Sequence, residues 1–172
     1  MKKVTVILAI IMMFVMNNKN ESIVIPNEAI RVRVIANSNS NYDLEAKENL
    51  RSDIEKKVYN LLTDTTSIDE ARKVLTNNIK NIEIEVEENF KKQNYDNTFQ
   101  VEYGLNYFPE KEFKGVIYQE GYYESLVVTI GKGEGNNWWC VLYPPLCLLD
   151  FEEETSDIEY QSFISEILNK YL

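Results

Sequence analysis

Residues 30–36 read Ile-Arg-Val-Arg-Val-Ile-Ala, and residues 37–40 read Asn-Ser-Asn-Ser. The first run is rich in β-branched residues and alternates strictly over its first five positions, which predicts a β-strand. The second run breaks this strand, and its side-chain oxygens can accept the free backbone N–H groups at the start of a helix. A strand followed directly by a helix is therefore expected.

Two helices are predicted after this strand. The first covers residues 42–62, where apolar residues recur every three or four positions, and Ser40 is placed to cap it. The second begins near Ser67, which caps it in a capping-box pair with Glu70, and reaches about Phe90 on the same periodicity. The acidic residues of 83–88 are spread around this second helix rather than converging, so we interpret them as a solvated face and not as a cation site.

A period of two takes over after Asn94 and predicts an antiparallel β-meander. A closing helix follows, for which Ser156 is a plausible cap. The order β, α, α, β-meander, α indicates an α+β fold in one globular domain, residues 30–172. The strands are expected at 99–107, 115–119, 124–130 and 138–143, and the helix at 157–171.

The N-terminus resembles an export signal. Lys2 and Lys3 precede an apolar run, residues 4–16, which is shorter than the roughly 20 residues of a membrane-spanning helix. We expect residues 1–18 to be a signal peptide or a short membrane anchor and residues 19–29 to be a linker. No small-residue cleavage site follows Met16, so removal of the segment stays open, and a buried core helix is the alternative.

The composition excludes several classes of protein. The net charge is −10, which opposes binding to nucleic acids. The chain contains no His, the side chain most often used for acid–base catalysis near neutral pH and for binding metals. We therefore expect no cofactor and no metal.

The two cysteines, Cys140 and Cys147, are separated by six residues. In an exported chain such a pair is a disulfide candidate, and two buried free thiols are the alternative. Two cysteines without His cannot complete a zinc site unless carboxylates join them.

Residues 131–135 read Gly-Lys-Gly-Glu-Gly, which at first suggests a phosphate-binding loop. The residues that follow are poor helix starters, no Gly-Lys-Ser/Thr sequence is present, and Glu134 would repel phosphate. We predict a flexible connection or bulge between two strands.

The most unusual segment, residues 136–147, reads Asn-Asn-Trp-Trp-Cys-Val-Leu-Tyr-Pro-Pro-Leu-Cys. Adjacent tryptophans on a strand point to opposite faces, so one can fill the core while the other needs a second surface. Large aromatic residues outside a core are favoured anchors of protein interfaces, although the last helix or the N-terminal segment could instead cover the second tryptophan. The predicted partner-binding residues are Asn136, Asn137, Trp138, Trp139, Tyr143, Pro144 and Pro145.

Three segments carry a resemblance to a known family. Residues 131–147 closely resemble the hallmark segment of stage II sporulation protein R, and residues 30–38 resemble the opening strand of that family. Residues 121–131 are also similar. The resemblance covers essentially the whole chain from Ile30 to Asp150, and the tandem Trp followed by Cys-Val-Leu and Pro-Pro-Leu-Cys is highly specific.

The resemblance implies a non-enzymatic signalling protein made in the forespore and exported into the space between the forespore and mother-cell membranes. Its implied partner is the mother cell's membrane-embedded aspartic protease, which matures pro-sigma-E. An anchored N-terminal segment would add peripheral membrane association. Two alternatives remain from the residues alone: an exported cell-wall hydrolase with paired carboxylates, and a wall-binding module whose aromatic residues stack on sugar rings.

Overall fold

The computed structural model describes residues 23–26, 28–147 and 156–171. The expected export segment, residues 1–18, lies outside them. Within the described residues no helix combines the length and the apolar character that a membrane crossing requires.

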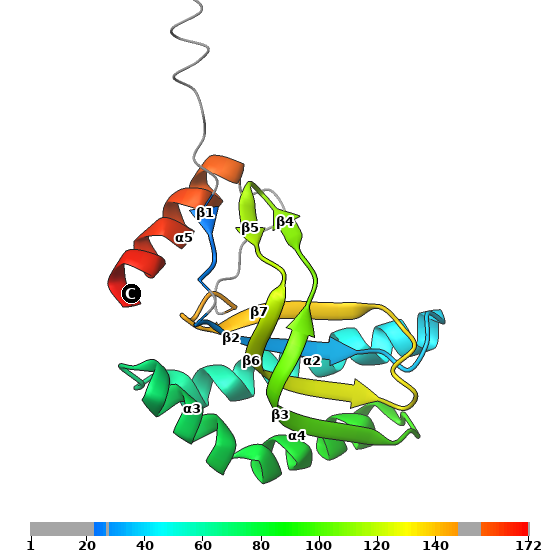
Figure 1. The fold of residues 1–172 in the computed structure, drawn as a ribbon. Helices are drawn as coiled ribbons and strands as arrows, with labels where there is room; N and C mark the ends of the chain where they lie inside the picture. The colour runs from blue at the N-terminus through cyan, green and yellow to red at the C-terminus, as the bar shows by residue number, and fades with distance from the viewer. Residues whose placement is uncertain (1–22, 27, 148–155, 172) are drawn as a thin grey trace, which may run out of the picture.

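A mixed four-stranded sheet forms the centre of the fold (Figure 1). The α+β class is confirmed, but the strands do not form a simple meander. β6 and β7 follow each other in sequence, yet β2 lies between them, parallel to β6 and antiparallel to β7. Because β2 is largely buried, it takes a central position where both of its edges are hydrogen-bonded. The strand order is β3 (Phe99–Phe108), β6 (Gly121–Ile130), β2 (Ile30–Ile35) and β7 (Asn137–Tyr143).

The hairpin of β3 and β6 continues beyond this sheet into a smaller one. Lys114 and Gly115 both have positive φ at its tip, which suits the tight turns that join antiparallel strands. Pro109 interrupts the ladder between the two parts of the hairpin. The smaller sheet has the order β1 (Ile23–Val24), β5 (Val116–Tyr118) and β4 (Lys111–Phe113).

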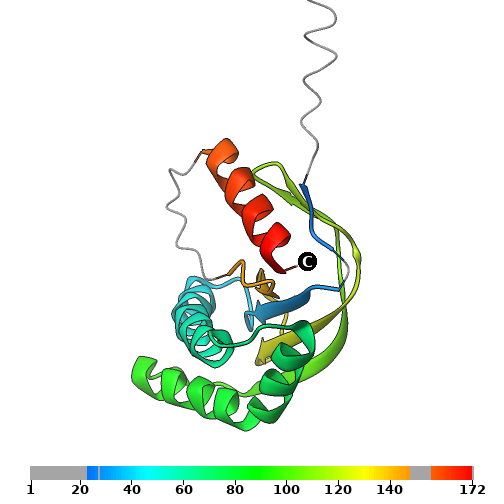
Figure 2. The same ribbon diagram turned by 90° about the vertical axis from the view of Figure 1, so that its left-hand side faces the viewer.

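The helices divide between two hydrophobic clusters. The first cluster joins three helices to one face of the large sheet, and the second joins the C-terminal helix to the small sheet (Figure 2). The first group is α2 (Asn41–Leu62), α3 (Ile68–Asn77) and α4 (Ile79–Gln93), and the C-terminal helix is α5 (Asp157–Tyr171). Ser40 and Ser67 accept backbone N–H groups at the starts of α2 and α3, which confirms both predicted caps.

The predicted second helix is in fact two helices. The chain leaves helical geometry at Asn78, where φ is −110° and ψ is 11°. The Asn78 side chain donates a hydrogen bond to the carbonyl of Val74, so it competes with the backbone ladder and favours a break.

The expected linker also contributes to the fold. β1 pairs with β5 in parallel, and Ile25 and Ala29 are buried in the second cluster. The described part of residues 19–29 therefore belongs to the folded domain, because its apolar side chains complete that cluster.

Candidate functional site

The predicted partner-binding residues run from Asn136, just before β7, along β7, an edge strand of the large sheet, to the turn that follows it. Asn136 and Asn137 are exposed, and both tryptophans are half-buried. Tyr143 and Pro144 are buried, while Pro145 is partly exposed. The structure thus presents one end of this segment to solvent and turns the other end inward.

The two tryptophans lie on opposite faces of the sheet, as strand alternation requires. Trp138 packs against the first hydrophobic cluster, and the guanidinium of Arg51 lies 4.9 Å from its ring centroid. Trp139 lies on the other face beside Phe108, with a ring-centroid separation of 6.2 Å, and the Lys111 ammonium is 5.4 Å from its ring. Among the described residues, these contacts of the Trp139 ring come from Phe108 of β3 and Lys111 of β4.

The proline turn is a packed structural element. The Tyr143 ring makes an edge-to-face contact with Tyr171 of α5 at 5.6 Å, and the Tyr143–Pro144 peptide bond is cis. Beside this turn lies a cavity of about 180 Å³ between the end of α2 and the end of α5. It is lined by Tyr59, Leu62, Thr63, Thr65, Leu142, Tyr143, Pro145 and Tyr171.

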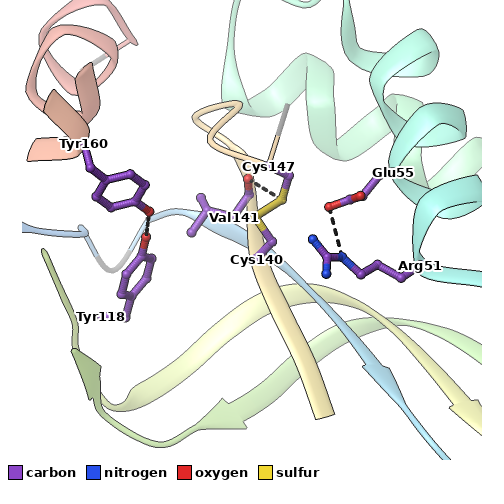
Figure 3. The surroundings of a disulfide bond; sticks show 7 residues. All are labelled: Arg51, Glu55, Tyr118, Cys140, Val141, Cys147 and Tyr160. Carbon is purple, nitrogen blue, oxygen red and sulfur yellow. Dashed lines mark hydrogen bonds and ion pairs between the residues drawn. A yellow bond between two sulfur atoms is a disulfide. The ribbon is translucent and has the colours of Figure 1, made fainter. Parts of the chain in front are cut away.

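The structure joins Cys140 and Cys147 in a disulfide across this turn, with a Cα–Cα separation of 5.6 Å (Figure 3). The Cys147 sulfur also lies 2.9 Å from the carbonyl oxygen of Val141. The backbone N–H groups of Leu146 and Cys147 donate to that same carbonyl. Because the covalent link and these contacts act on one short loop, the end of β7 has little freedom to move.

The glycine loop connects β6 to β7, as predicted for a connection between two strands. Gly131 and Gly133 have positive φ, which glycine adopts without steric cost. Gly135 packs so closely on Ser38 that a Cβ atom would collide with the Ser38 carbonyl. The loop is held by the Asn37 side chain, which accepts a hydrogen bond from Lys132 N at 3.0 Å, and by Asn39, which accepts one from Asn136 N at 2.8 Å.

Asp43 organises the other side of this junction. Its carboxylate accepts hydrogen bonds from the hydroxyl of Ser38, from Tyr95 at 2.6 Å and from Asn37 at 3.0 Å. These bonds, the one from Ser38 first among them, lower the pKa of Asp43 to about 2. Burial, together with the bond to Asp43, raises the pKa of Tyr95 to about 12. A carboxylate held this firmly in its charged form suits a structural role better than a general acid.

Sequence reasoning did not predict the burial of Arg31. It is 2% exposed, and its guanidinium carbon lies 4.2 Å from the Phe108 ring centroid and 4.8 Å from that of Tyr123. Burial lowers the pKa of both Arg31 and Arg33. The nearby Tyr123 and Tyr118 act in the opposite direction and raise the pKa of Arg31, but burial has the larger effect. The alternation of Arg and Val in residues 30–34 predicted only a strand. Phe108 and Tyr123 of the β3–β6 hairpin cover Arg31.

Among the described residues, no group of three or more Cys, Asp or Glu side chains is placed to hold a metal ion.

Comparison with known proteins gives concordant results. A family model described as stage II sporulation protein R (spore_II_R) matches residues 26–153. Stage II sporulation protein R of Bacillus subtilis (strain 168) is 39% identical over 134 residues, which are 78% of this chain and 60% of that protein. The match therefore spans less than two thirds of that relative. No solved structure is similar at a significant level.

Proposed function

Because the chain belongs to the stage II sporulation protein R family, we propose that it is the exported signal that activates a membrane-embedded aspartic protease during sporulation. This protease then processes pro-sigma-E in the mother cell. In this proposal the chain acts by contact, not by catalysis.

One observation carries the proposal. The two most distinctive segments of the sequence, residues 30–38 and 131–147, are more than ninety positions apart but form neighbouring strands, β2 and β7. Their flanking loops are joined by Asn37 to Lys132 and by Asn39 to Asn136. A rigid surface of this kind loses little entropy when a partner binds, which favours a recognition role.

We place the contact surface at the exposed end of β7, where Asn136 and Asn137 continue into the half-buried Trp138 and Trp139. In this proposal Tyr143, Pro144 and the disulfide hold the strand in position. Pro145, at the rim of the cavity beside Tyr171, is the remaining partly exposed residue of the turn and extends the surface.

The proposal places the chain in the space between the forespore and mother-cell membranes, with residues 1–18 directing export. Removing residues 1–16 should leave a folded domain that no longer signals between cells. A truncated chain that still triggers the neighbouring cell from the cytoplasm would contradict this placement.

The direct test combines the purified full-length chain with membranes that contain the protease and its pro-protein. Cleavage that depends on the added chain is the expected result. Membranes whose protease lacks its catalytic aspartates are the control and should show no cleavage. If the folded chain leaves the pro-protein intact while an authentic activator cleaves it in the same membranes, the proposal fails.

A second candidate, binding to the cell wall, is favoured by one exposed aromatic pair. Tyr107 and Tyr122 lie edge to face at 5.6 Å, and Tyr122 is 70% exposed. Such rings can stack on sugars. Sedimentation with purified peptidoglycan tests this alternative, and Tyr122→Ala should abolish any co-sedimentation.

A further inference from the structure

Three N–H donors on one face of the large sheet have no acceptor among the described residues. They are Nε of Arg31, Nε of Arg33 and Nε1 of Trp139, and each atom is buried. Arg33 pairs directly with Trp139 across β2 and β7, and Arg31 is two positions along the same strand, so all three side chains share a face. We call these three residues the donor cluster.

The donor cluster surrounds one aromatic ring. The guanidinium carbons of Arg31 and Arg33 lie 4.2 and 5.3 Å from the Phe108 centroid, and Trp139 makes an edge-to-face contact with the same ring. Contacts with aromatic faces stabilise a guanidinium through its positive charge. The Arg31 guanidinium also hydrogen-bonds Tyr123. The ring faces provide no acceptor for the three N–H groups named above, and a buried donor without an acceptor is costly.

No described carboxylate forms an ion pair with Arg31 or Arg33, although the chain carries a net charge of −10. By contrast, Arg72 forms a two-pronged pair with Glu124. The donor cluster therefore concentrates positive charge on an acidic protein, and the Lys111 ammonium over Trp139 adds to it.

We propose that the donor cluster binds a carboxylate, with Arg33 and Trp139 as its direct ligands. A carboxylate is a planar group that only accepts hydrogen bonds, and it matches the forked donors of arginine. The side chains of Arg33 and Trp139 are partly exposed although their unpaired N–H groups are buried, so a ligand would enter beside these two residues, whereas the buried Arg31 supports the site with its charge. The acidic surface elsewhere on the chain disfavours a larger polyanion.

The same chemistry could come from a free small carboxylate or from an acidic side chain of a bound protein. We assign it to an acidic side chain of the protein partner, an extension that rests on the proposed function. The site adjoins the exposed end of β7. Asn137 pairs with Ile35 across the two strands, and Arg33 is two residues from Ile35 on β2. A partner that contacts Asn137 would therefore lie within reach of Arg33.

Binding of a carboxylate can be measured without any partner. Acetate is titrated into the ¹⁵N-labelled full-length chain in non-ionic detergent, and the side-chain N–H signals are followed by NMR. A titration with chloride at the same ionic strength is the control for general salt effects. The signals of Trp139 Nε1 and Arg33 Nε should shift in a saturable way. The Trp138 indole signal, from the opposite face, should not move.

Matched variants test the assignment. Trp139→Phe keeps an aromatic ring and should weaken acetate binding about threefold to tenfold, the effect of one lost hydrogen bond. Arg33→Lys keeps the charge without the fork and should also weaken binding. Arg51→Gln, beside Trp138, is the control and should bind like the unmodified chain. The proposal is overturned if acetate causes no saturable shift of the Trp139 Nε1 and Arg33 Nε signals. It is also overturned if these signals already have the positions of hydrogen-bonded groups and acetate does not move them.

The source of the carboxylate is decided in the activation assay. If Arg33→Lys binds acetate weakly and also activates the protease weakly, while Arg51→Gln is normal in both, the ligand is a side chain of the partner. If Arg33→Lys activates normally, that assignment is overturned and a free carboxylate is the ligand. If the unmodified chain binds acetate but activates nothing, the proposed function fails while the site remains.

Discussion

The side-chain oxygen of Asn37 accepts a hydrogen bond from the backbone N–H of Lys132 at 3.0 Å, across 95 positions of sequence. This bond ties the end of β2 to the glycine loop that leads into β7. Asn97 lies on the same side of the loop, close to Gly131. The loop therefore owes its conformation to side chains from distant parts of the chain and not to its glycines alone.

Gly135→Ala should lower the free energy of unfolding by about 1–3 kcal/mol, because the new methyl group collides with the Ser38 carbonyl in a well-packed junction. Gly104→Ala is the control: a Cβ atom at that position meets nothing within 4 Å, so the change should be small. Urea unfolding of both variants measures the difference. Equal stabilities would show that the loop can move away from Ser38.

The stability of the chain should fall as the pH drops from about 4 to about 2. Asp43 has a pKa of about 2 in the folded chain, below the ordinary value of 3.8 expected on unfolding. The unfolded state therefore binds the proton more tightly, so the contribution of Asp43 is complete above pH 4 and is lost on acidification through its folded pKa.

The same network predicts the effect of Asp43→Asn. At neutral pH the variant should be about 1–3 kcal/mol less stable, because charge-assisted hydrogen bonds from Ser38 and Tyr95 are weakened. Its acid slope should also be shallower than that of the unmodified chain. Asp64→Asn, at an exposed position, should change neither quantity. Denaturant titrations between pH 2 and pH 7 test both statements.

Removal of the disulfide by a double Cys→Ser change at Cys140 and Cys147 should cost about 2.5 kcal/mol, the loop-entropy value for so short a ring. A reducing agent should destabilise the unmodified chain by a similar amount and leave the double variant unchanged. Thiol labelling of the unfolded, unreduced chain supplies an independent check. Two labelled cysteines would mean that the thiols are free.

The two tryptophans should differ in what they support. Trp138→Ala should reduce the free energy of unfolding by about 2 kcal/mol, because Trp138 packs on the first cluster but is only half-buried. Trp139→Phe keeps the contact with Phe108 and should unfold nearly as the unmodified chain does, yet activate the protease less. If Trp139→Phe signals normally at unchanged stability, the contact surface lies elsewhere.

Most of the secondary structure was predictable because its signals are local. The β2 and α5 positions agree with the predicted ones, and the serine caps of α2 and α3 fall at the expected residues. Hydrophobic periodicity and capping depend on neighbours within a few positions, so the sequence carries them directly. The break at Asn78 was missed because helical periodicity continues on both sides of it.

The candidate site was predictable only in part. Strand alternation correctly placed Trp138 and Trp139 on opposite faces, but it could not show that Tyr143 and Pro144 are buried. Tyr143 lies between the end of α2 and the end of α5, two helices that are far apart in the sequence. Contacts of this kind have no local signature.

The sequence by itself determined the α+β class, most of the elements and the segments that mark the family, because each follows from short-range patterns of residues. Only the tertiary structure decided that β2 enters between β6 and β7 and that the hairpin of β3 and β6 folds its rings over Arg31. Strand order depends on which strand edges form hydrogen bonds with another strand and which sheet faces are buried by other elements. Both are properties of the assembled sheets. The donor cluster follows from that assembly, since Trp139 shares a face with Arg31 and Arg33 only after β2 and β7 have paired.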